Sequence, residues 1–464
     1  MTDASAPAVL ATALPWKVSR RRLIPSMLIG TFIEWYDMFI YTQGAALIFP
    51  HLFFPAFSPA AGTLAAFATF GVGYLARPVG AVLFGHVGDR FGRRTSLIFT
   101  LVLMGASTAL VGLLPTFQQI GVLAPALLVV LRLLQGLGAG AEYSGSFVLV
   151  AESAPRSRRG FWSAFPGIGV YLGQGTAAVA GATVFALPLS AAESFAWRIP
   201  YFVSALLVVL GLIVRLKLQE SPVFRQLESI TAARKTPFVQ VFLHSKKRLA
   251  MALVLTAPIA FNGYVTTTYG ITYSVQHGTS TANVLIGSII GAYVAIITVP
   301  IAGWLSDRFG RRPVYLVLSL CSGASAFPYF ALLSSGKAPL LWIAMVAIVA
   351  PFIYSLTGGQ AALLAELFPA EYRYSGVALS RELSTALLTA FCPIIALGLV
   401  ELNGGSPWIL CASMALIGVL TAIVVFLLPE TRAREMGPGA AETAPPDLVA
   451  EAQASAAPTM AVLR

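Results

Sequence analysis

Residues 85–94 read Gly-His-Val-Gly-Asp-Arg-Phe-Gly-Arg-Arg, a polar and strongly basic stretch between two long apolar runs. The pattern returns in the second half of the chain, where residues 303–312 read Gly-Trp-Leu-Ser-Asp-Arg-Phe-Gly-Arg-Arg, and seven of the ten positions are identical. One such stretch could be an ordinary turn. Two copies about half a chain apart indicate a duplicated fold.

A weaker second repeat supports the duplication. Residues 151–155 read Ala-Glu-Ser-Ala-Pro after the fourth apolar run, and residues 365–369 read Ala-Glu-Leu-Phe-Pro at the matching place in the second half. These two segments are separated by nearly the same distance along the chain as the two basic stretches. The two halves therefore stay in register across several apolar runs.

The composition indicates a membrane protein. Of 464 residues, 57% are hydrophobic and 11% are charged, and the mean hydropathy is +0.80. Soluble proteins carry about 25% charged residues, and a soluble core could not hide this much apolar surface. The net charge of +11 does not indicate nucleic-acid binding, because the basic residues are confined to particular loops.

Twelve apolar runs approach the roughly 20 residues that a bilayer span requires. Six precede a polar linker at residues 217–247 and six follow it, so the predicted fold is all-α, with twelve transmembrane helices in two six-helix bundles, 23–216 and 248–430. The predicted spans are 23–49, 61–84, 95–114, 122–149, 161–187, 197–216, 249–275, 282–304, 313–333, 339–364, 376–399 and 407–428.

Proline and glycine mark special places within these spans. Pro258, Pro351 and Pro393 lie in the seventh, tenth and eleventh spans, and such breaks are tolerated where a helix borders a cavity. Gly167, Gly169, Gly173 and Gly175 in the fifth span are expected to allow close helix packing instead.

The basic residues also predict an orientation. Of the 30 Lys and Arg residues, 25 lie in the two tails, in the loops after even-numbered spans or, for Arg215, at the end of the sixth span that leads into such a loop. By the positive-inside rule, these loops, the linker and both termini are cytoplasmic. We expect residues 1–22 to be a tail, the first apolar run to remain as a span rather than a cleaved signal, and the Ala- and Pro-rich residues 431–464 to be a disordered cytoplasmic tail.

The repeated Gly-x-x-x-Asp-Arg-x-Gly-Arg-Arg stretch resembles the loop signature of the major facilitator superfamily. Other segments resemble its bacterial metabolite:proton symporter group, whose members carry shikimate, 2-oxoglutarate, citrate, or proline and betaine. These segments are residues 34–37 (Glu-Trp-Tyr-Asp), 65–80, 132–136 (Arg-Leu-Leu-Gln-Gly), 140–142 (Gly-Ala-Glu) and 197–200 (Trp-Arg-Ile-Pro). The resemblance covers residues 20–430 and implies proton-driven uptake across a bacterial inner membrane.

The repeated stretch is expected to act as a gate. Its glycines allow close helix approach, and Asp89 and Asp307 can cap a helix or pair with an arginine. Such a cluster can latch the cytoplasmic ends of two helices in one transport state, although a purely topogenic basic loop is the alternative. The expected gating residues are Gly85, Asp89, Arg90, Gly92 and Arg93, with Gly303, Asp307, Arg308, Gly310 and Arg311.

Ionisable residues inside spans are the candidates for function, because a bilayer makes them costly. Glu34 and Asp37 lie three residues apart on one helical face, which Tyr41 shares. Two carboxylates this close disfavour double ionisation, which suits a proton carrier. Both acids are therefore predicted to couple protons, and simple pairing with a nearby arginine is the alternative.

Arg132 lies between leucines in the fourth span, where a guanidinium must face an anion or many acceptors. It can hold a substrate carboxylate or brace Gln135. It can also pair with Asp37 or Glu34. The resemblance to the superfamily's Arg-x-x-Gln-Gly pattern favours a part in proton coupling.

Arg381 and Glu382 form a charged pair in the eleventh span, where the chain departs from the pattern of the symporter group. Arg381 can bind a carboxylate, while Glu382 can neutralise it or bind an amine. The alternative is an internal ion pair with Arg373 or Glu371 near the membrane edge.

The seventh span carries a polar, aromatic face. Asn262, Thr266, Tyr269 and Tyr273 follow the helical spacing i, i+4, i+7 and i+11, which fits the wall of a cavity for a small polar solute. The expected substrate-binding residues are Arg381, Glu382, Arg132, Asn262, Tyr269 and Tyr41.

The sequence predicts a monomeric secondary transporter, not an enzyme, and the resemblance implies that it takes up a small organic acid or zwitterion with a proton by alternating access. The substrate is expected to be shikimate-like, a dicarboxylate or betaine-like. No cofactor or metal is expected, because the four histidines are scattered and the three cysteines lie in apolar runs. The alternatives are a proton-coupled antiporter that exports a drug or metabolite, and a membrane receptor or enzyme.

Overall fold

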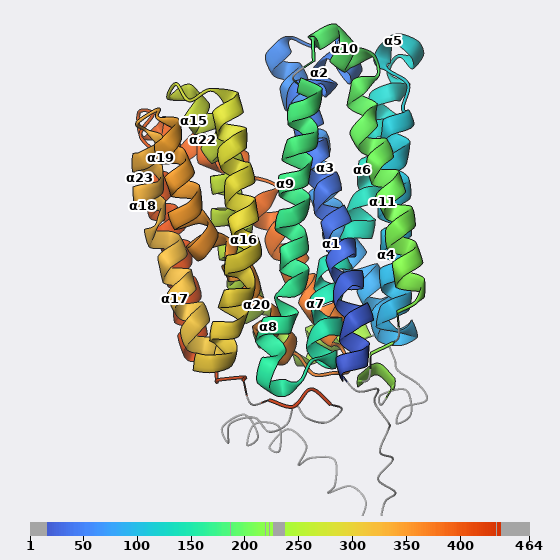
Figure 1. The fold of residues 1–464 in the computed structure, drawn as a ribbon, viewed down its shortest axis with the longest axis vertical. Coiled ribbons are helices and arrows are strands. Elements are labelled where there is room, and N and C mark those ends of the chain that lie inside the picture. Colours follow the sequence, from blue (N-terminus) through green and yellow to red (C-terminus); the bar gives the residue numbers. More distant parts are fainter. Residues whose placement is uncertain are drawn as a thin grey trace, which may run out of the picture.

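The computed structural model describes residues 16–185, 187–218, 220–221, 223–225, 237–432 and 434–437. All regular elements in these ranges are helical, and they form two bundles side by side (Figure 1). Ten of the described helices are long and apolar enough to cross a membrane. The other two predicted spans are also helical: the fifth contains the 21-residue helix α9, and the eleventh consists of three consecutive helical segments.

The N-terminal bundle contains the first six spans. They are α1 (Trp16–Leu47), α3 (Pro59–Phe91), α4 (Arg93–Leu113), α6 with α7 (Leu123–Ala139, Glu142–Ser153), α8 with α9 (Arg159–Ser163, Phe165–Phe185) and α11 (Ile199–Leu216). Short helices connect them: α2 (Phe49–Phe53), α5 (Phe117–Ile120), η1 (Arg156–Arg158), α10 (Leu189–Ser194) and η2 (Ala196–Arg198).

The C-terminal bundle begins with the short helix α13 (Pro237–His244). The seventh span is α14, η3, η4 and α15 (Lys246–Pro258, Ile259–Gly263, Val265–Tyr269, Gly270–Gln276), and the eighth is α16 (Thr281–Phe309). The ninth is α17 with α18 (Arg311–Ala324, Ala326–Leu333), and the tenth is α19, η5 and α20 (Ala338–Ala344, Met345–Tyr354, Leu356–Leu367). The eleventh is α21, η6 and α22 (Arg373–Ser384, Thr385–Thr389, Cys392–Leu402), and the twelfth is α23 (Trp408–Leu427).

Wide, π-helical turns interrupt three spans near the predicted proline breaks. Such turns begin directly after Pro258 in the seventh span and include Pro351 in the tenth. In the eleventh span the helix is π-helical at η6 and breaks just before Cys392. Proline removes a backbone donor and distorts the ladder of hydrogen bonds, so these spans are locally widened.

Close packing of glycines joins the first and fifth spans. A β-carbon placed on Gly169 would lie 2.6 Å from the carbonyl oxygen of Leu28, and one on Gly173 would lie 2.6 Å from that of Phe32. Only glycine permits this approach of α9 to α1, as predicted. The outer faces of the bundles are apolar and exposed, for example Leu206 (62% exposed) and Phe426 (63%), which suits contact with lipid.

Three predicted boundaries need correction. Helix α1 begins at Trp16, within the predicted tail 1–22. The predicted linker 217–247 contains α13, and Val241 of this helix is fully buried. Residues 431, 432 and 434–437 belong to the predicted disordered tail, yet several of them form defined hydrogen bonds with the bundles. The remainder of that tail, 438–464, and residues 1–15 lie outside the described residues.

Both copies of the repeated stretch lie at the same end of the molecule, the lower end in Figure 1. We call it the motif end. The opposite end, which carries α2, α10 and α15, is called the far end.

Candidate functional site

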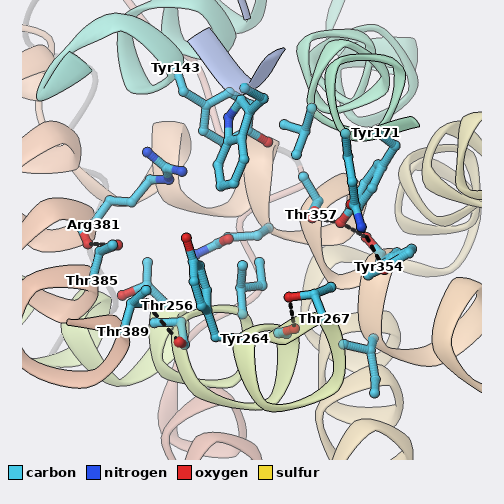
Figure 2. A pocket seen from close by; sticks show the side chains of 18 of the residues that line it. Tyr143, Tyr171, Thr256, Tyr264, Thr267, Tyr354, Thr357, Arg381, Thr385 and Thr389 are labelled. Atoms are coloured by element: carbon cyan, nitrogen blue, oxygen red, sulfur yellow. Dashed lines mark hydrogen bonds between the residues drawn. The ribbon is translucent and has the colours of Figure 1, made fainter. Parts of the chain in front are cut away.

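A cavity lies between the bundles and encloses about 750 Å³ of empty space, part of it open to solvent. The N-terminal bundle lines it with residues of α1, α7 and α9, and the C-terminal bundle lines it with residues of the seventh, tenth and eleventh spans. The π-helical segments η3, η5 and η6 each contribute residues to the cavity wall. The cavity is therefore a joint product of both halves (Figure 2).

The wall of the cavity combines aromatic rings and hydroxyls with one charge. Six aromatic side chains and five threonines line it, and Arg381 is the one charged side chain among the described lining residues. Trp35 Nε1 and Gln360 Nε2, also in the wall, are buried donors without a hydrogen-bond partner in the described structure. Buried donors normally find acceptors, so the cavity suits a ligand rich in acceptor oxygens.

Contacts between α9 and the tenth span join the bundles at the cavity. The Tyr171 hydroxyl lies 2.8 Å from Thr357 Oγ1 and donates to the Tyr354 carbonyl oxygen at 3.1 Å. The rings of Tyr171 and Tyr354 lie 4.4 Å apart, and Gln174 Nε2 donates to the Tyr354 hydroxyl at 3.3 Å (Figure 2). These hydroxyls already have protein partners, which leaves Arg381 as the strongest ligand-binding group.

Arg381 is one member of a four-charge chain, which we define as Glu34, Arg77, Glu382 and Arg381. Arg381 donates to Glu382 at 2.5 Å, and Arg77 donates to Glu34 at 2.5 Å and to Glu382 at 3.5 Å. All four are buried, and with all four groups ionised the chain is neutral. Because Glu34 and Arg77 belong to α1 and α3 and the other two to α21, the chain crosses between the bundles.

Asp37 lies in a different place, inside the N-terminal bundle. Its carboxylate accepts hydrogen bonds from Thr108 Oγ1 at 2.8 Å and from Ser204 Oγ. Gln135 Nε2 in turn donates to Thr108 Oγ1 at 2.7 Å and links this site to Arg132. Asp37 is fully buried and makes no direct ion pair among the described residues.

The buried guanidinium of Arg132 has spare donors. It donates to Gln135 Oε1, and its carbon lies 3.7 Å from the ring centre of Tyr41. Its Nε and Nη2 have no hydrogen-bond partner among the described residues. A buried cation held mainly by an amide and a ring can exchange partners with a carboxylate at modest cost.

At the motif end, Asp89 of the first repeated stretch joins the two bundles. It accepts hydrogen bonds from the Ser375 backbone N–H at 2.9 Å and hydroxyl at 2.6 Å, on α21 of the other bundle. Arg93 pairs with Asp89 at 3.2 Å and with Glu152 at 3.5 Å. Glu152 also pairs with Arg373 of the C-terminal bundle at 3.0 Å.

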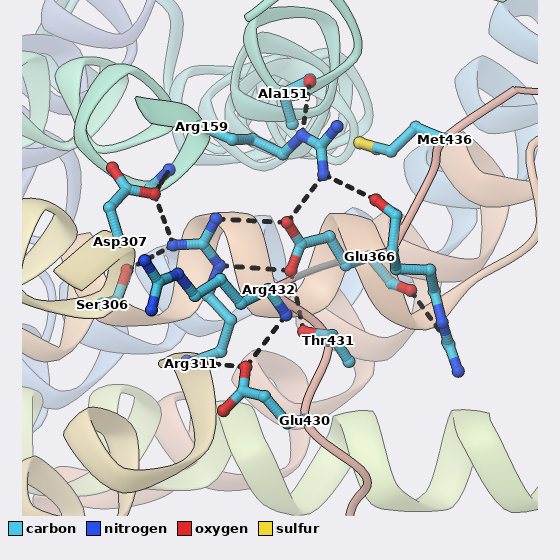
Figure 3. Close-up of polar contacts among 12 residues, drawn as sticks. Ala151, Arg159, Ser306, Asp307, Arg311, Glu366, Glu430, Thr431, Arg432 and Met436 are labelled. Carbon is cyan, nitrogen blue, oxygen red and sulfur yellow. Dashed lines mark hydrogen bonds and ion pairs between the residues drawn. The ribbon is translucent and has the colours of Figure 1, made fainter. Parts of the chain in front are cut away.

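The second repeated stretch makes the equivalent contacts (Figure 3). Asp307 accepts hydrogen bonds from the backbone N–H groups of residues 160–161 at 2.8 Å each, in the N-terminal bundle. Arg311 pairs with Asp307 at 2.7 Å and with Glu366 at 3.2 Å, and Arg159 pairs with Glu366 at 2.9 Å. We call the two sets of contacts the latch.

A glycine and a glutamate support each half of the latch. Gly92 and Gly310 adopt φ angles of +105° and +108°, which glycine alone adopts without strain. Glu220 accepts hydrogen bonds from the first two backbone N–H groups of α4, and Glu430 does the same for α17. A carboxylate at a helix N-terminus is stabilising. Burial nevertheless raises the pKa of Glu220 above its usual value.

Residues 27–380 and 286–463 match the Major Facilitator Superfamily. The chain belongs to this superfamily. It is 37% identical to the shikimate transporter of Escherichia coli (88% of this chain, 94% of the relative), and 34% identical to the citrate-proton symporter of Klebsiella pneumoniae (86% and 90%). It is 32% identical to the proline/betaine transporter of Salmonella typhimurium (87% and 83%).

Solved structures of the superfamily share the fold. The proton:xylose symporter XylE bound to 6-bromo-6-deoxy-D-glucose superposes with a TM-score of 0.74 at 20% identity, covering 91% of this chain and 98% of that one. The inward-open conformation of XylE from E. coli gives 0.61 at 19% identity, covering 90% and 97%. The twelve-helix, two-bundle prediction is confirmed, and the protein is a multi-pass membrane transporter and not an enzyme.

In this superfamily member the predicted substrate residues do not form one group. Arg381 lines the cavity and Glu382 is bonded to it. Tyr41 instead packs under Arg132 and shares a hydrogen bond with Thr69. Neither Tyr41 nor Arg132 contributes to the described cavity wall.

The predicted face of the seventh span is wrong in part. Asn262 is fully buried and directs its amide toward Ser322 and the Met414 carbonyl oxygen at 3.4 Å each. Tyr269 is buried beside Tyr273 and Phe330. The residues of this span that face the cavity also follow helical spacing but lie on another face: Thr256, Ile259, Ala260, Gly263, Tyr264 and Thr267.

Some of the predicted gating residues lie at the contact between the bundles and others do not. The backbone at Gly303 lies so close to Gly160 that a β-carbon would be 2.5 Å from its carbonyl oxygen, and Gly85 packs against Ser375. Arg90 and Arg308, in contrast, are exposed, and their guanidinium groups lie over nearby aromatic rings rather than in the latch. They suit a topogenic role.

Sequence reasoning missed Arg77, the centre of the four-charge chain. It stands within the quoted segment 65–80, and a lone arginine in a span was a sufficient signal. Arg159 and Arg373 were also missed, although they occupy matching places after the second repeat, Ala-Glu-x-x-Pro, in each half. The alternative partners considered for Arg381, Arg373 and Glu371, are not those found, because α21 directs Glu382 toward Arg77.

Proposed function

We propose that this protein takes up a small organic acid together with a proton, and that Arg381 binds the substrate carboxylate in the central cavity. The observation that carries the proposal is the single cation in a wall of aromatic rings, hydroxyls and unpaired donors, among the described lining residues. A guanidinium binds a carboxylate through two parallel hydrogen bonds. No acidic side chain is among the described lining residues, which disfavours a cationic drug.

One cation matches one carboxylate. The relatives include a shikimate transporter, a citrate-proton symporter and a proline/betaine transporter. The cavity has room for a ring or chain that bears hydroxyl or keto oxygens, which Trp35 and Gln360 can bind. We therefore propose a monocarboxylate with further oxygens, rather than a tricarboxylate or a betaine.

We propose Asp37 as the proton carrier, with Glu34 as the second candidate. Asp37 is buried without a direct ion pair in the described part of the chain and lies within the electrostatic reach of Arg132. Protonating Asp37 removes the negative charge that acts on Arg132, and the unpaired donors of Arg132 can then bind another acceptor, so the two can act as a proton-dependent switch. Glu34 already forms an ion pair with Arg77.

We further propose that the latch closes the motif end, that this end and both termini face the cytoplasm, and that transport occurs by rocking of the bundles in the bacterial inner membrane. The basic loops at the motif end support this orientation. One chain supplies both bundles and the whole cavity, which supports a monomeric unit. Opening of the latch would expose the cavity to the cytoplasm.

The test is uptake by purified protein in liposomes with an acidic exterior. We expect radiolabelled shikimate to accumulate with the pH gradient and not without it, and citrate and betaine to be poor substrates. Arg381→Ala should remove the uptake, whereas Arg312→Lys, a half-buried control at the motif end, should not. Gradient-driven uptake of citrate or betaine with none of shikimate would overturn the monocarboxylate assignment.

A further inference from the structure

We propose that Glu382 changes partners when substrate binds, leaving Arg381 for Arg77, and thereby pulls the two bundles together. This inference rests on the proposed binding of a carboxylate at Arg381. It assigns Arg77 and Glu382 as positioning residues that convert occupancy of the cavity into closure, a role distinct from substrate contact and from proton carriage.

The distances from Glu382 to its two arginine partners are unequal, as an exchange between the partners requires. Glu382 lies 2.5 Å from Arg381 on its own helix α21 but 3.5 Å from Arg77 across the interface. Each bundle thus keeps one tight neutral pair, Glu34 with Arg77 and Glu382 with Arg381, and the bridge between the pairs is long. Without substrate the bundles can separate and leave each pair intact.

A bound carboxylate changes this balance. It occupies Arg381 and repels Glu382, because two buried carboxylates on one guanidinium repel strongly in a low dielectric. Arg77 is the other cation that contacts Glu382 among the described residues, and it has an unbonded Nε. Glu34 retains an unbonded Oε2, so the chain can rearrange without losing its partners.

The other groups near the chain do not offer an alternative. Glu142 acts on Glu34 electrostatically but is paired with Arg215. Tyr74 lies under Arg77 and its hydroxyl contacts that of Tyr264, which lines the cavity. Tyr143 lies under Arg381. These tyrosine hydroxyls are neutral and do not replace an arginine as the partner of a carboxylate. Glu382 therefore exchanges between Arg381 and Arg77.

The bridge acts on the same pair of helices as the latch. Arg77 and Asp89 both lie on α3, and Glu382 and Ser375 both lie on α21. Twelve residues of helix separate Arg77 from Asp89, about 18 Å along α3. A tighter Arg77–Glu382 pair therefore adds attraction between α3 and α21 at the level where Arg381 lines the cavity.

The experiment compares isosteric variants of the full-length protein with tritiated shikimate as probe, measuring equilibrium binding and counterflow exchange. Glu382→Gln removes the competitor for Arg381, so shikimate should bind more tightly, by roughly tenfold for one charge-assisted contact. Counterflow should slow severalfold because the bridge is lost. Arg77→Lys keeps the positive charge beside Glu34 but loses the several N–H donors of the guanidinium that can bind two carboxylates at once. Counterflow should therefore slow, while the affinity for shikimate stays unchanged.

Glu371→Gln, which removes an acid just before α21, is the matched control and should change neither quantity. Weaker binding or unchanged counterflow in Glu382→Gln would overturn the partner exchange. Failure of the wild-type protein to bind shikimate would instead contradict the proposed function, so the two failures are distinguishable.

Discussion

The motif end and the central cavity lie at the same interface between the bundles but differ in symmetry. At the motif end nearly every contact has a counterpart: Asp89 and Asp307, Arg93 and Arg311, Glu152 and Glu366, Arg373 and Arg159, Glu220 and Glu430. Around the cavity the charged residues have no counterpart in the other half of the chain. In the register of the two repeats, the position that corresponds to Arg77 is Ala295, and the one that corresponds to Arg381 is Gly167.

The difference shows how a duplicated chain divides its tasks. Opening and closing move both bundles against each other, so a gate works best when each half holds the other in the same way. Substrate binding and proton coupling take place at one central site. A charged residue that serves this site in one half therefore needs no equivalent residue in the other half. Substitutions in the two regions can test this division, and they are taken from the largest expected effect to the smallest.

Asp37→Asn should have the largest effect, on an asymmetric residue. Accumulation against a gradient should be abolished, since the carrier loses its proton site, while counterflow survives at least in part because a loaded carrier need not release a proton. Accumulation and counterflow in proteoliposomes are the measurements. If pH-driven accumulation persists in Asp37→Asn and disappears in Glu34→Gln, the proton belongs to the four-charge chain instead.

Arg381→Lys should weaken binding of shikimate by about 1–3 kcal/mol, roughly 5- to 150-fold, because lysine keeps the charge but loses the paired N–H donors of the guanidinium. Equilibrium binding measures it, with Arg132→Lys as comparison, where affinity should change less because Arg132 lies outside the cavity wall. Unchanged affinity in both Arg381→Lys and Arg381→Ala would make Arg381 structural.

Asp89→Asn and Asp307→Asn should each slow turnover severalfold with little change in affinity, because they remove latch charges and not ligands. The two effects should be similar in size, since the halves are equivalent. Initial uptake rates and equilibrium binding separate the two quantities. A large loss of affinity with normal turnover would place these aspartates in the binding site.

Glu220→Gln and Glu430→Gln should have the smallest effects. Each weakens the cap on one helix, α4 or α17, which is worth about 0.5–2 kcal/mol of stability. Thermal unfolding in detergent should show a small and comparable decrease in melting temperature for both. A decrease in only one would show that the two halves are supported differently.

The fold could be predicted from the sequence, and the place of the latch contacts could be located in it, because both leave repeated or periodic signals. The two basic stretches and the matched Glu152 and Glu366 are visible in the sequence alone and indicate where the latch lies. The cavity was harder to predict. Regular helical spacing correctly groups Asn262 and Tyr269 on one face of the seventh span, but spacing alone does not tell which face meets the cavity, and this face is buried in the bundle.

The ion pairs of the centre were harder still. Arg77 and Glu382 lie far apart in the sequence, in different halves of the chain, and their contact depends on how α3 meets α21. No spacing within one helix encodes such a pairing. Sequence alone therefore identified most of the charged residues in the spans but not which of them share a partner.

The most direct test of the account measures distances between spin labels at both ends of the interface. After replacement of the three native cysteines, one pair of labels would replace exposed Arg90 and Arg308 at the motif end, and another would replace Phe57 and Leu402 at the far end. In the double variant Asp89→Asn, Asp307→Asn, the account predicts that the motif-end distance lengthens while the far-end distance shortens. Distributions that stay unchanged, or ends that lengthen together, would contradict alternating access governed by the latch.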